Sequence, residues 1–250
     1  MLSAEVGGAC RTSGLPPGSI GRVCGETVVL QVRGPAASHL LSVVGPCTLR
    51  GVPVVAWFPT QPPHPDDDLV AVADRVLVDS TRRDAATAFR VCLELSRRQP
   101  VTDLAWVRLE RWRQLLVRLL GGTAPCAFAS GVRRIESEGE TGRSLLLAGW
   151  LMNRLGVASD VVRIIDAEQP TLRLWAEHEE RHASIAVDSP VESGEVRGVS
   201  LSDARGSSRR TLVRPIWSPV AVLERALNQR ARGAVWEESV VGALRLAAGC

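Results

Sequence analysis

The spacing of apolar and polar residues changes along the 250-residue chain, and the change predicts two kinds of structure. Between Thr27 and Gln99, short β-branched runs alternate with segments whose apolar residues recur every three to four positions. Such strand–helix–strand alternation predicts a parallel sheet covered by helices. After Cys126, most short runs alternate apolar and polar residues, which is typical of an antiparallel sheet with one solvated face. The pattern therefore predicts an α/β N-terminal domain, with a partly parallel sheet, followed by an α+β C-terminal domain.

The first half contains three predicted strands and three predicted helices. The strands are Thr27–Arg33, Val52–Trp57 and Val76–Asp79, and the helices are Ala36–Val44, Leu69–Arg75 and Asp84–Arg98. Because Val52–Trp57 is continuously apolar, we expect that strand to be buried on both faces. The run Asp66–Asp68 precedes a helix, where the positive end of the helix dipole favours carboxylates. A metal site at these aspartates is the alternative, although the glycine of a calcium-binding loop is absent.

The second half contains a longer series of predicted strands, bracketed by helices. The strands are Cys126–Gly139, Val161–Ile165, Leu172–Glu177, Ala183–Val187, Val196–Leu201 and Thr211–Arg214. We expect the strands after residue 160 to form an antiparallel meander. The helices are Ser144–Leu155, which Gly156 ends, together with Val220–Arg230 and Val235–Ala247. Ser218-Pro219 is a typical helix opening, with a cap residue followed by proline.

These elements divide the chain into three predicted parts. Residues 1–26 are rich in Gly, Ser and Pro and have little periodicity, so we expect a loose or diverged N-terminus. Residues 27–102 form the predicted α/β domain, and residues 103–250 form the predicted α+β domain, with a boundary just after Leu120 as the alternative.

The segment Asp103–Leu120 links the two predicted domains and has a strongly amphipathic pattern. Read as one helix, it places one apolar stripe opposite a charged face, and the stripe is Ala105, Leu109, Trp112, Leu116, Leu119 and Leu120. An ordinary core helix would show this pattern. Two tryptophans beside arginines are also typical of a protein–protein hot spot. The pattern leaves both interpretations open.

The same segment, D-L-A-W-x-R-L-x-x-W-R, resembles the signature of the glucose-6-phosphate dehydrogenase assembly protein family (OpcA). Three other stretches resemble that family in the same order: VPVVAWFP at Val52–Pro59, LVAVADRVLVDS at Leu69–Ser80 and LLLAGWLMNRLGV at Leu145–Val157. The resemblance implies a non-catalytic protein that binds glucose-6-phosphate dehydrogenase and promotes its active oligomer. Family members begin with additional strand–helix structure, so we expect a truncated or diverged N-terminal sheet here.

The resemblance and the residue types together suggest where a partner would bind. Aromatic and arginine side chains dominate the energetics of protein interfaces. The predicted partner-binding residues are Trp57, Phe58, Trp106, Arg108, Trp112 and Arg113. We expect no catalytic residue, no cofactor and no metal.

Composition excludes several other classes of function. The net charge of +3 is too small to favour nucleic acid or an anionic membrane as a partner. No apolar run approaches the ~18 residues that a membrane span needs. The six cysteines form no C-x-x-C pair and no secretory signal is present, so we expect a cytoplasmic protein with reduced thiols. The chain contains no lysine, which excludes Schiff-base and lysine P-loop chemistry.

One motif supports an alternative function, a zinc-dependent hydrolase. His178, Glu179 and His182 match H-E-x-x-H, in which two histidines one helical turn apart bind zinc and the glutamate acts as base. Residues on both sides, however, alternate with period two. That pattern places the motif in a hairpin, where the histidines cannot converge as they would on a helix.

Overall fold

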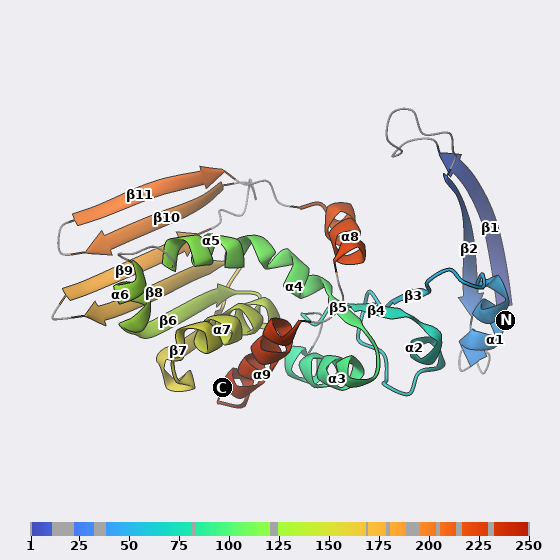
Figure 1. The fold of residues 1–250 in the computed structure, drawn as a ribbon, viewed down its shortest axis with the longest axis horizontal. Helices are drawn as coiled ribbons and strands as arrows, with labels where there is room; N and C mark the ends of the chain where they lie inside the picture. The colour runs from blue at the N-terminus through green and yellow to red at the C-terminus, as the bar shows by residue number, and fades with distance from the viewer. Residues whose placement is uncertain are drawn as a thin grey trace. The chain divides into compact units, whose positions relative to one another are not determined.

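The computed structural model describes residues 2–11, 23–32, 39–81, 84–120, 125–168, 170–178, 181–188, 196–203, 206–213, 217–229 and 233–249 (Figure 1). The chain forms two compact units, residues 1–52 and 53–250. Each unit is described here by itself.

The first unit contains a hairpin followed by a short helical segment. Strands β1 (Leu2–Arg11) and β2 (Val23–Val32) pair antiparallel, and α1 (Leu40–Val44) leads into the 3-10 turn η2 (Gly45–Cys47). The sequence predicted a loose segment over residues 1–26, whereas residues 2–11 form strand β1 in the structure. In its register Leu2 is opposite Val32, and Arg11 is opposite Val23.

The second unit begins with a three-stranded parallel sheet. Its strands are β3 (Val55–Trp57), β4 (Arg75–Val78) and β5 (Val101–Asp103), in that order across the sheet. Helices α2 (Asp68–Val72) and α3 (Ala85–Arg98) are the crossovers. Each helix begins at an aspartate cap: Asp67 accepts from the Leu69 amide at 2.9 Å, and Asp84 accepts from the Ala86 amide at 3.1 Å.

Strand β3 corrects one sequence prediction. The strand was expected to be buried on both faces, but it lies at the sheet edge and the Trp57 side chain is 50% exposed. A continuous apolar run indicates a strand without indicating its place in the sheet. Strand β4 has the buried environment that was expected of β3, because it lies between two neighbours.

The second sheet of this unit has six strands in the order β11-β10-β9-β8-β6-β7. Their bounds are β6 (Val132–Gly139), β7 (Val162–Asp166), β8 (Thr171–His178), β9 (Arg181–Asp188), β10 (Val196–Asp203) and β11 (Gly206–Val213), with the 3-10 turn η3 (Ser159–Val161) before β7. All neighbouring strands pair antiparallel except β6 and β7, which are parallel. The prediction of a wholly antiparallel meander is therefore wrong at β7, which follows a helix and returns to the edge beside β6.

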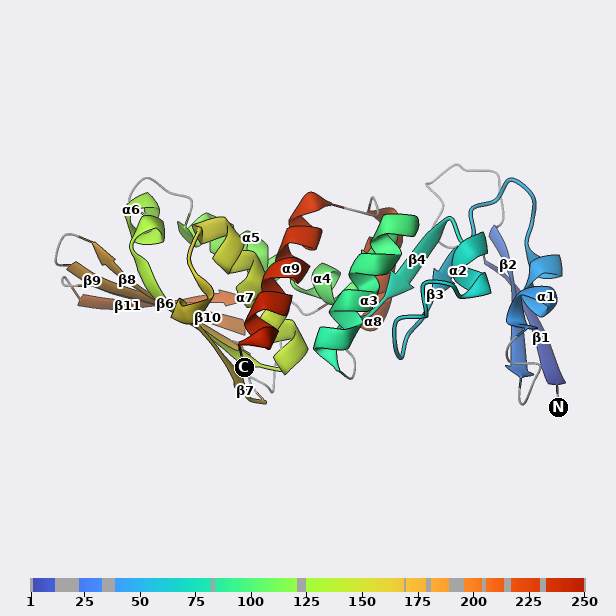
Figure 2. The same cartoon turned by 90° about the horizontal axis from the view of Figure 1, so that it is seen from below.

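Three helices lie between the two sheets in the chain, and a fourth connects β6 to β7. They are α4 (Leu104–Arg108), α5 (Glu110–Leu120), α6 (Pro125–Ser130) and α7 (Thr141–Leu155). Figures 1 and 2 show α5, α6 and α7 on the same face of the six-stranded sheet. The predicted strand Cys126–Gly139 is wrong over its first part, which is α6. The predicted helix Ser144–Leu155 is confirmed as α7, and Gly156 ends it with a φ of 65°.

The chain ends in helices α8 (Pro219–Asn228) and α9 (Ala234–Ala248). As predicted, Ser218 caps α8 by accepting from the Ala221 amide at 3.1 Å. Helix α9 packs on α7 and α3, whereas α8 packs on α4. The parallel sheet, helices α3, α5, α7 and α9, and the second sheet therefore share one continuous apolar core. This core is consistent with the predicted α/β and α+β fold classes, and the predicted boundary at residue 102 remains a prediction.

The H-E-x-x-H motif lies at the connection between β8 and β9. His178 pairs with Arg181 in the strand register, and Glu177 pairs with His182, so the histidines belong to two antiparallel strands. Glu179 falls outside the described residues. Within the described residues, no cluster of three or more His, Cys, Asp or Glu side chains could hold a metal ion. None of the helices described above is long and apolar enough to span a membrane.

Candidate functional site

Asp103 is the centre of the polar structure around the segment 103–120. It ends β5, is buried, and caps α4 by accepting from the Ala105 amide at 3.0 Å. It also accepts from the Ser80 amide at 3.2 Å, the Ser80 hydroxyl at 2.6 Å and the indole Nε1 of Trp236 at 3.1 Å. Burial raises the pKa of the Asp103 carboxyl, while the donated hydrogen bonds act in the opposite direction. The Asp103 carboxylate thus connects the end of β5 to Ser80, which follows β4, and to helices α4 and α9.

A second buried carboxylate, Asp79, lies at the end of β4. Its Oδ1 accepts from the Thr81 hydroxyl at 3.0 Å, and its Oδ2 forms an ion pair with Arg108 of α4. The Asp79 side chain is 4% exposed and that of Arg108 is 29% exposed. Arg108, which the sequence placed at a partner interface, therefore contacts the protein's own interior.

The carboxyl ends of β4 and β5 leave little free space. In α/β proteins ligands commonly bind at this edge of a parallel sheet. Here a cavity of about 100 Å³ lies beside Thr102, Asp103, Trp106 and Trp236. Small-molecule sites usually occupy roughly 300–1,000 Å³. In the described part of the chain, the Asp79 and Asp103 carboxylates at this edge are already engaged by neighbouring side chains, an arrangement that holds elements together.

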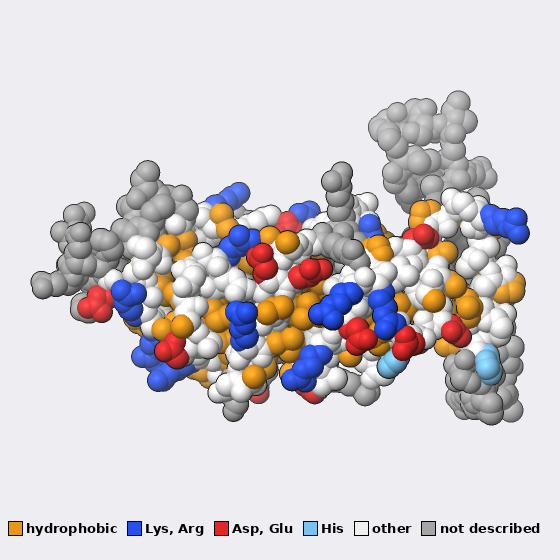
Figure 3. All heavy atoms as spheres, turned by 60° about the horizontal axis from the view of Figure 1, so that its bottom comes forward, with side chains coloured by type: hydrophobic (Ala, Val, Ile, Leu, Met, Phe, Trp, Pro, Cys, Tyr) orange, Lys and Arg blue, Asp and Glu red, His pale blue; other side chains and the backbone are white. Residues whose placement is uncertain are grey.

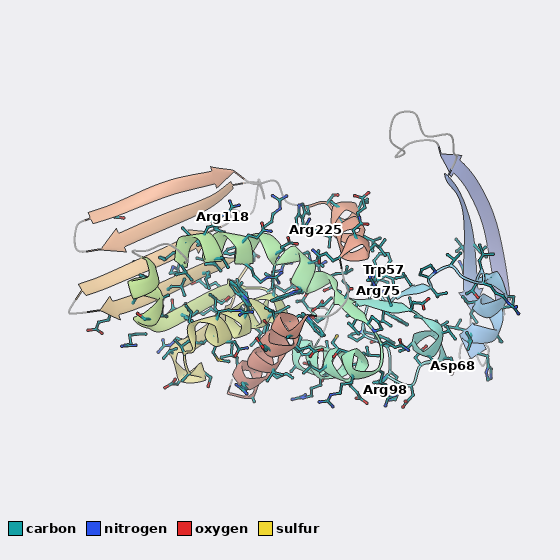
Figure 4. All side chains as sticks on the ribbon, viewed as in Figure 1. Trp57, Asp68, Arg75, Arg98, Arg118 and Arg225 are labelled. Atoms are coloured by element: carbon teal, nitrogen blue, oxygen red, sulfur yellow. The ribbon has the colours of Figure 1, made fainter. Side chains whose placement is uncertain are left out.

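Glu110, the first residue of α5, ties that helix to α8. Both of its carboxylate oxygens pair with Arg225, and Oε2 also accepts from the Gln229 amide at 2.9 Å. Hydrogen bonding from Arg225, opposed by partial burial, lowers the pKa of Glu110. The guanidinium groups of Arg111 and Arg225 lie 4.7 and 4.8 Å from the Trp217 ring centroid. Figure 4 shows Arg225 on the side of α8 that faces α5.

Arg113 and Trp106 form a separate contact on the other side of the segment. The Arg113 guanidinium lies 3.3 Å from the Trp106 ring centroid and donates to the Trp106 carbonyl at 3.0 Å. Burial lowers the pKa of Arg113 to about 10, against the opposing influence of Glu110 and Asp103. This contact spans the break between α4 and α5 at Leu109.

The six residues predicted to bind a partner occupy different environments. Trp112 is buried in the core, Trp106 and Phe58 pack partly against it, and Arg108 and Arg113 make the intramolecular contacts above. Trp57 is the most exposed aromatic residue among the six, at the edge strand β3 (Figure 4). The side chains of the six residues do not form one continuous surface. Whether they contact a partner stays a prediction.

Sequence reasoning missed a wide groove between α5 and α7. The groove has a volume of about 700 Å³, and its lining includes Val117 and Arg118 of α5 and Arg154 and Leu155 of α7. The signal available in the sequence was an arginine in the last turn of each helix. Only the packing of α5 against α6 and α7 shows that both arginines face one groove.

Several solved structures are similar in fold to this chain. KijD10, a 3-ketoreductase from Actinomadura kijaniata in complex with NADP and TDP-benzene, matches with a TM-score of 0.54 and 10% identity, over 87% of this chain and 81% of that one. Its open conformation matches with a TM-score of 0.51 and 11% identity, over 86% and 85% of the two chains. These similarities concern the fold alone. No curated protein sequence matches the chain.

The fold is that of an α/β protein in which the buried Asp103 carboxylate holds α4 and α9 at the end of β5. The sequence itself matches two families. Residues 3–94 match the glucose-6-phosphate dehydrogenase subunit N-terminal domain, and residues 99–240 match the C-terminal domain. The chain therefore belongs to the glucose-6-phosphate dehydrogenase assembly protein family, OpcA, as its motifs indicated.

Proposed function

We propose that this protein binds glucose-6-phosphate dehydrogenase and promotes its active oligomer without catalysing a reaction itself. The observation that supports this most directly is the pair of consecutive matches, residues 3–94 and 99–240, to the two domains of the dehydrogenase assembly family. The proposed setting is the cytoplasm, where the protein would support the oxidative pentose phosphate pathway.

The polar edge of the parallel sheet supports the non-catalytic part of the proposal. Asp79 and Asp103 are the buried carboxylates at this edge, and both are held by hydrogen-bond donors from the protein itself. A general base must be within hydrogen-bond reach of a proton on a substrate. The neighbouring cavity of about 100 Å³ is small for a substrate.

A protein without its own chemistry can activate an enzyme only through differential affinity for two of its states. We therefore propose an allosteric activator that binds the assembled dehydrogenase more tightly than its separate subunits. A hundredfold preference would shift the assembly equilibrium by about 2.7 kcal/mol per bound activator. By linkage, the assembled enzyme must then bind the activator correspondingly better.

The experiment is a titration of the purified full chain into the dehydrogenase of the same organism, with activity and calorimetric heat measured in parallel. We expect saturable binding and a rise in activity that saturates at the same ratio. Saturable binding without any change in activity would contradict activation. No binding at micromolar concentrations of both proteins would contradict the proposed partner.

A further inference from the structure

We propose that the groove between α5 and α7 receives a helical segment of the dehydrogenase that carries an apolar stripe flanked by carboxylates. The inference rests on the proposed function, because it names the partner's recognition element. The groove is defined by Val117, Arg118 and Leu120 of α5 and by Leu151, Arg154 and Leu155 of α7.

The floor of this groove is apolar and open to solvent. Val117 is 57% exposed although it lines the groove, and the lining residues Leu120 and Leu155 are half-buried. Exposed aliphatic side chains that line a concave surface favour an apolar occupant, because covering them removes apolar area from water. The groove therefore favours a partner that also presents aliphatic or aromatic side chains.

The rim of the groove is positively charged. Arg118 and Arg154 are exposed in the last turns of their helices, and in the described part of the chain neither has a carboxylate within 4.0 Å. Glu110, at the far end of the groove, is neutralised by Arg225. Figure 4 shows Arg118 on α5. Two uncompensated guanidinium groups favour carboxylates on the occupant, which can bind each of them in a bidentate manner.

The shape favours a helix over a small anion. The lining runs from Glu110 to Leu120 along α5, a length of roughly 15 Å at the helical rise. An amphipathic helix binds such a groove with side chains spaced three and four residues apart. A small phosphorylated ligand would need several polar groups converging on it, whereas Arg118 and Arg154 stand at the rim above an apolar floor.

Other exposed arginines offer a comparison with Arg118 and Arg154. On the face shown in Figure 3, arginines are scattered among apolar and acidic side chains and do not form one continuous patch. Arg97 of α3 and Arg245 of α9 are exposed arginines in the last turns of their helices, as Arg118 and Arg154 are. They provide matched controls that do not line the groove.

The test compares two double variants of the full chain in calorimetric titrations against the cognate dehydrogenase. Arg118→Glu with Arg154→Glu should weaken binding at least ~30-fold, because like charges would oppose the partner's carboxylates. Arg97→Glu with Arg245→Glu should change the affinity by less than about threefold. Val117→Gln should weaken binding without changing its dependence on salt. Circular dichroism and thermal melting should show that all variants fold.

Each outcome separates the groove from the proposed function. If wild type binds and the groove variant binds as tightly as the control variant, the groove proposal is overturned and the function survives. If wild type does not bind, both are overturned. If inorganic phosphate stabilises wild type but not the groove variant against heat, while both bind the dehydrogenase equally, the groove is a small-anion site and the proposal is wrong. Hydrogen exchange in the complex should protect the C-terminal turns of α5 and α7.

Discussion

Gly149 of α7 and Gly242 of α9 lie directly against each other where the two helices cross. A Cβ added at Gly242 would stand 3.0 Å from the Gly149 Cα and 2.8 Å from its carbonyl oxygen. A Cβ at Gly149 would stand 2.4 Å from the Ala243 nitrogen. The backbones of α7 and α9 touch at this point, so a side chain at either position would force the two helices apart.

Gly149→Ala should destabilise the protein even though alanine is the better helix former. The added methyl would contact backbone that cannot move independently, and overpacking of this kind costs about 1–3 kcal/mol. Urea unfolding measures the loss. Gly249→Ala is the matched control, because a Cβ there meets its nearest neighbour at an ordinary 3.8 Å. Equal stabilities for the two variants would show that α7 and α9 are not in backbone contact.

Trp236→Phe should destabilise the protein by about 1.5–3 kcal/mol, because it removes the hydrogen bond from Nε1 to the buried Asp103 carboxylate while keeping an aromatic ring. Thermal and urea unfolding of both proteins provide the measurement. In an Asp103→Asn background, where the acceptor is neutral, the same substitution should cost less. An unchanged cost in that background would mean that the hydrogen bond contributes little and that only ring packing matters.

The Glu110–Arg225 pair should make stability fall in acid. The folded-state pKa of Glu110 lies below its ordinary value of 4.5, mainly because Arg225 donates to it. Stabilisation by the pair is therefore complete above pH 4.5 and is lost as the pH falls through the lower folded-state pKa. Wild type should exceed Glu110→Gln in unfolding free energy by about 1 kcal/mol near neutral pH. The difference should shrink towards about pH 3, and a pH-independent difference would refute the assignment.

Cys92 and Cys47 should react with thiol reagents at very different rates. Cys92 is buried, and burial, reinforced by Asp103 and Asp79, raises the pKa of its thiol well above the ordinary value. Cys47 is exposed. In native protein Cys92 should react at least ~100-fold more slowly than Cys47, because a buried thiol is rarely accessible as thiolate. Peptide mapping after timed alkylation measures both rates, and comparable rates would contradict the packing of α3.

Local chemistry explains why the sequence predicted several elements well. Helix α3 and its Asp84 cap, helix α8 and its Ser218 cap, and the end of α7 at Gly156 depend on residues within one or two turns. The parallel pairing of β7 with β6 depends on where the chain places β7 after helix α7. The local pattern of apolar and polar residues does not specify that place. Helix α6 was hidden because Pro125–Ser130 is too short to show a helical period.

The site was harder to predict for the same reason. Arg108 and Arg113 were predicted to contact a partner, which stays a prediction, and within the chain they contact Asp79 and the Trp106 ring. An Arg108→Ala variant would leave Asp79 without its ion pair and should lose about 2 kcal/mol of stability. Any effect of that variant on dehydrogenase binding therefore has to be compared with its folding. Arg118 and Arg154 lie 36 residues apart in the numbering, and only packing brings them to one groove.

Sedimentation of the dehydrogenase with and without the proposed activator is the most direct measurement of preferential binding to the assembled enzyme. Dehydrogenase diluted until its subunits partly dissociate should return to the larger species when saturating activator is added, with activity rising in parallel. The activator should also bind concentrated, assembled enzyme more tightly than diluted enzyme. An unchanged distribution of species at saturating activator would contradict the account.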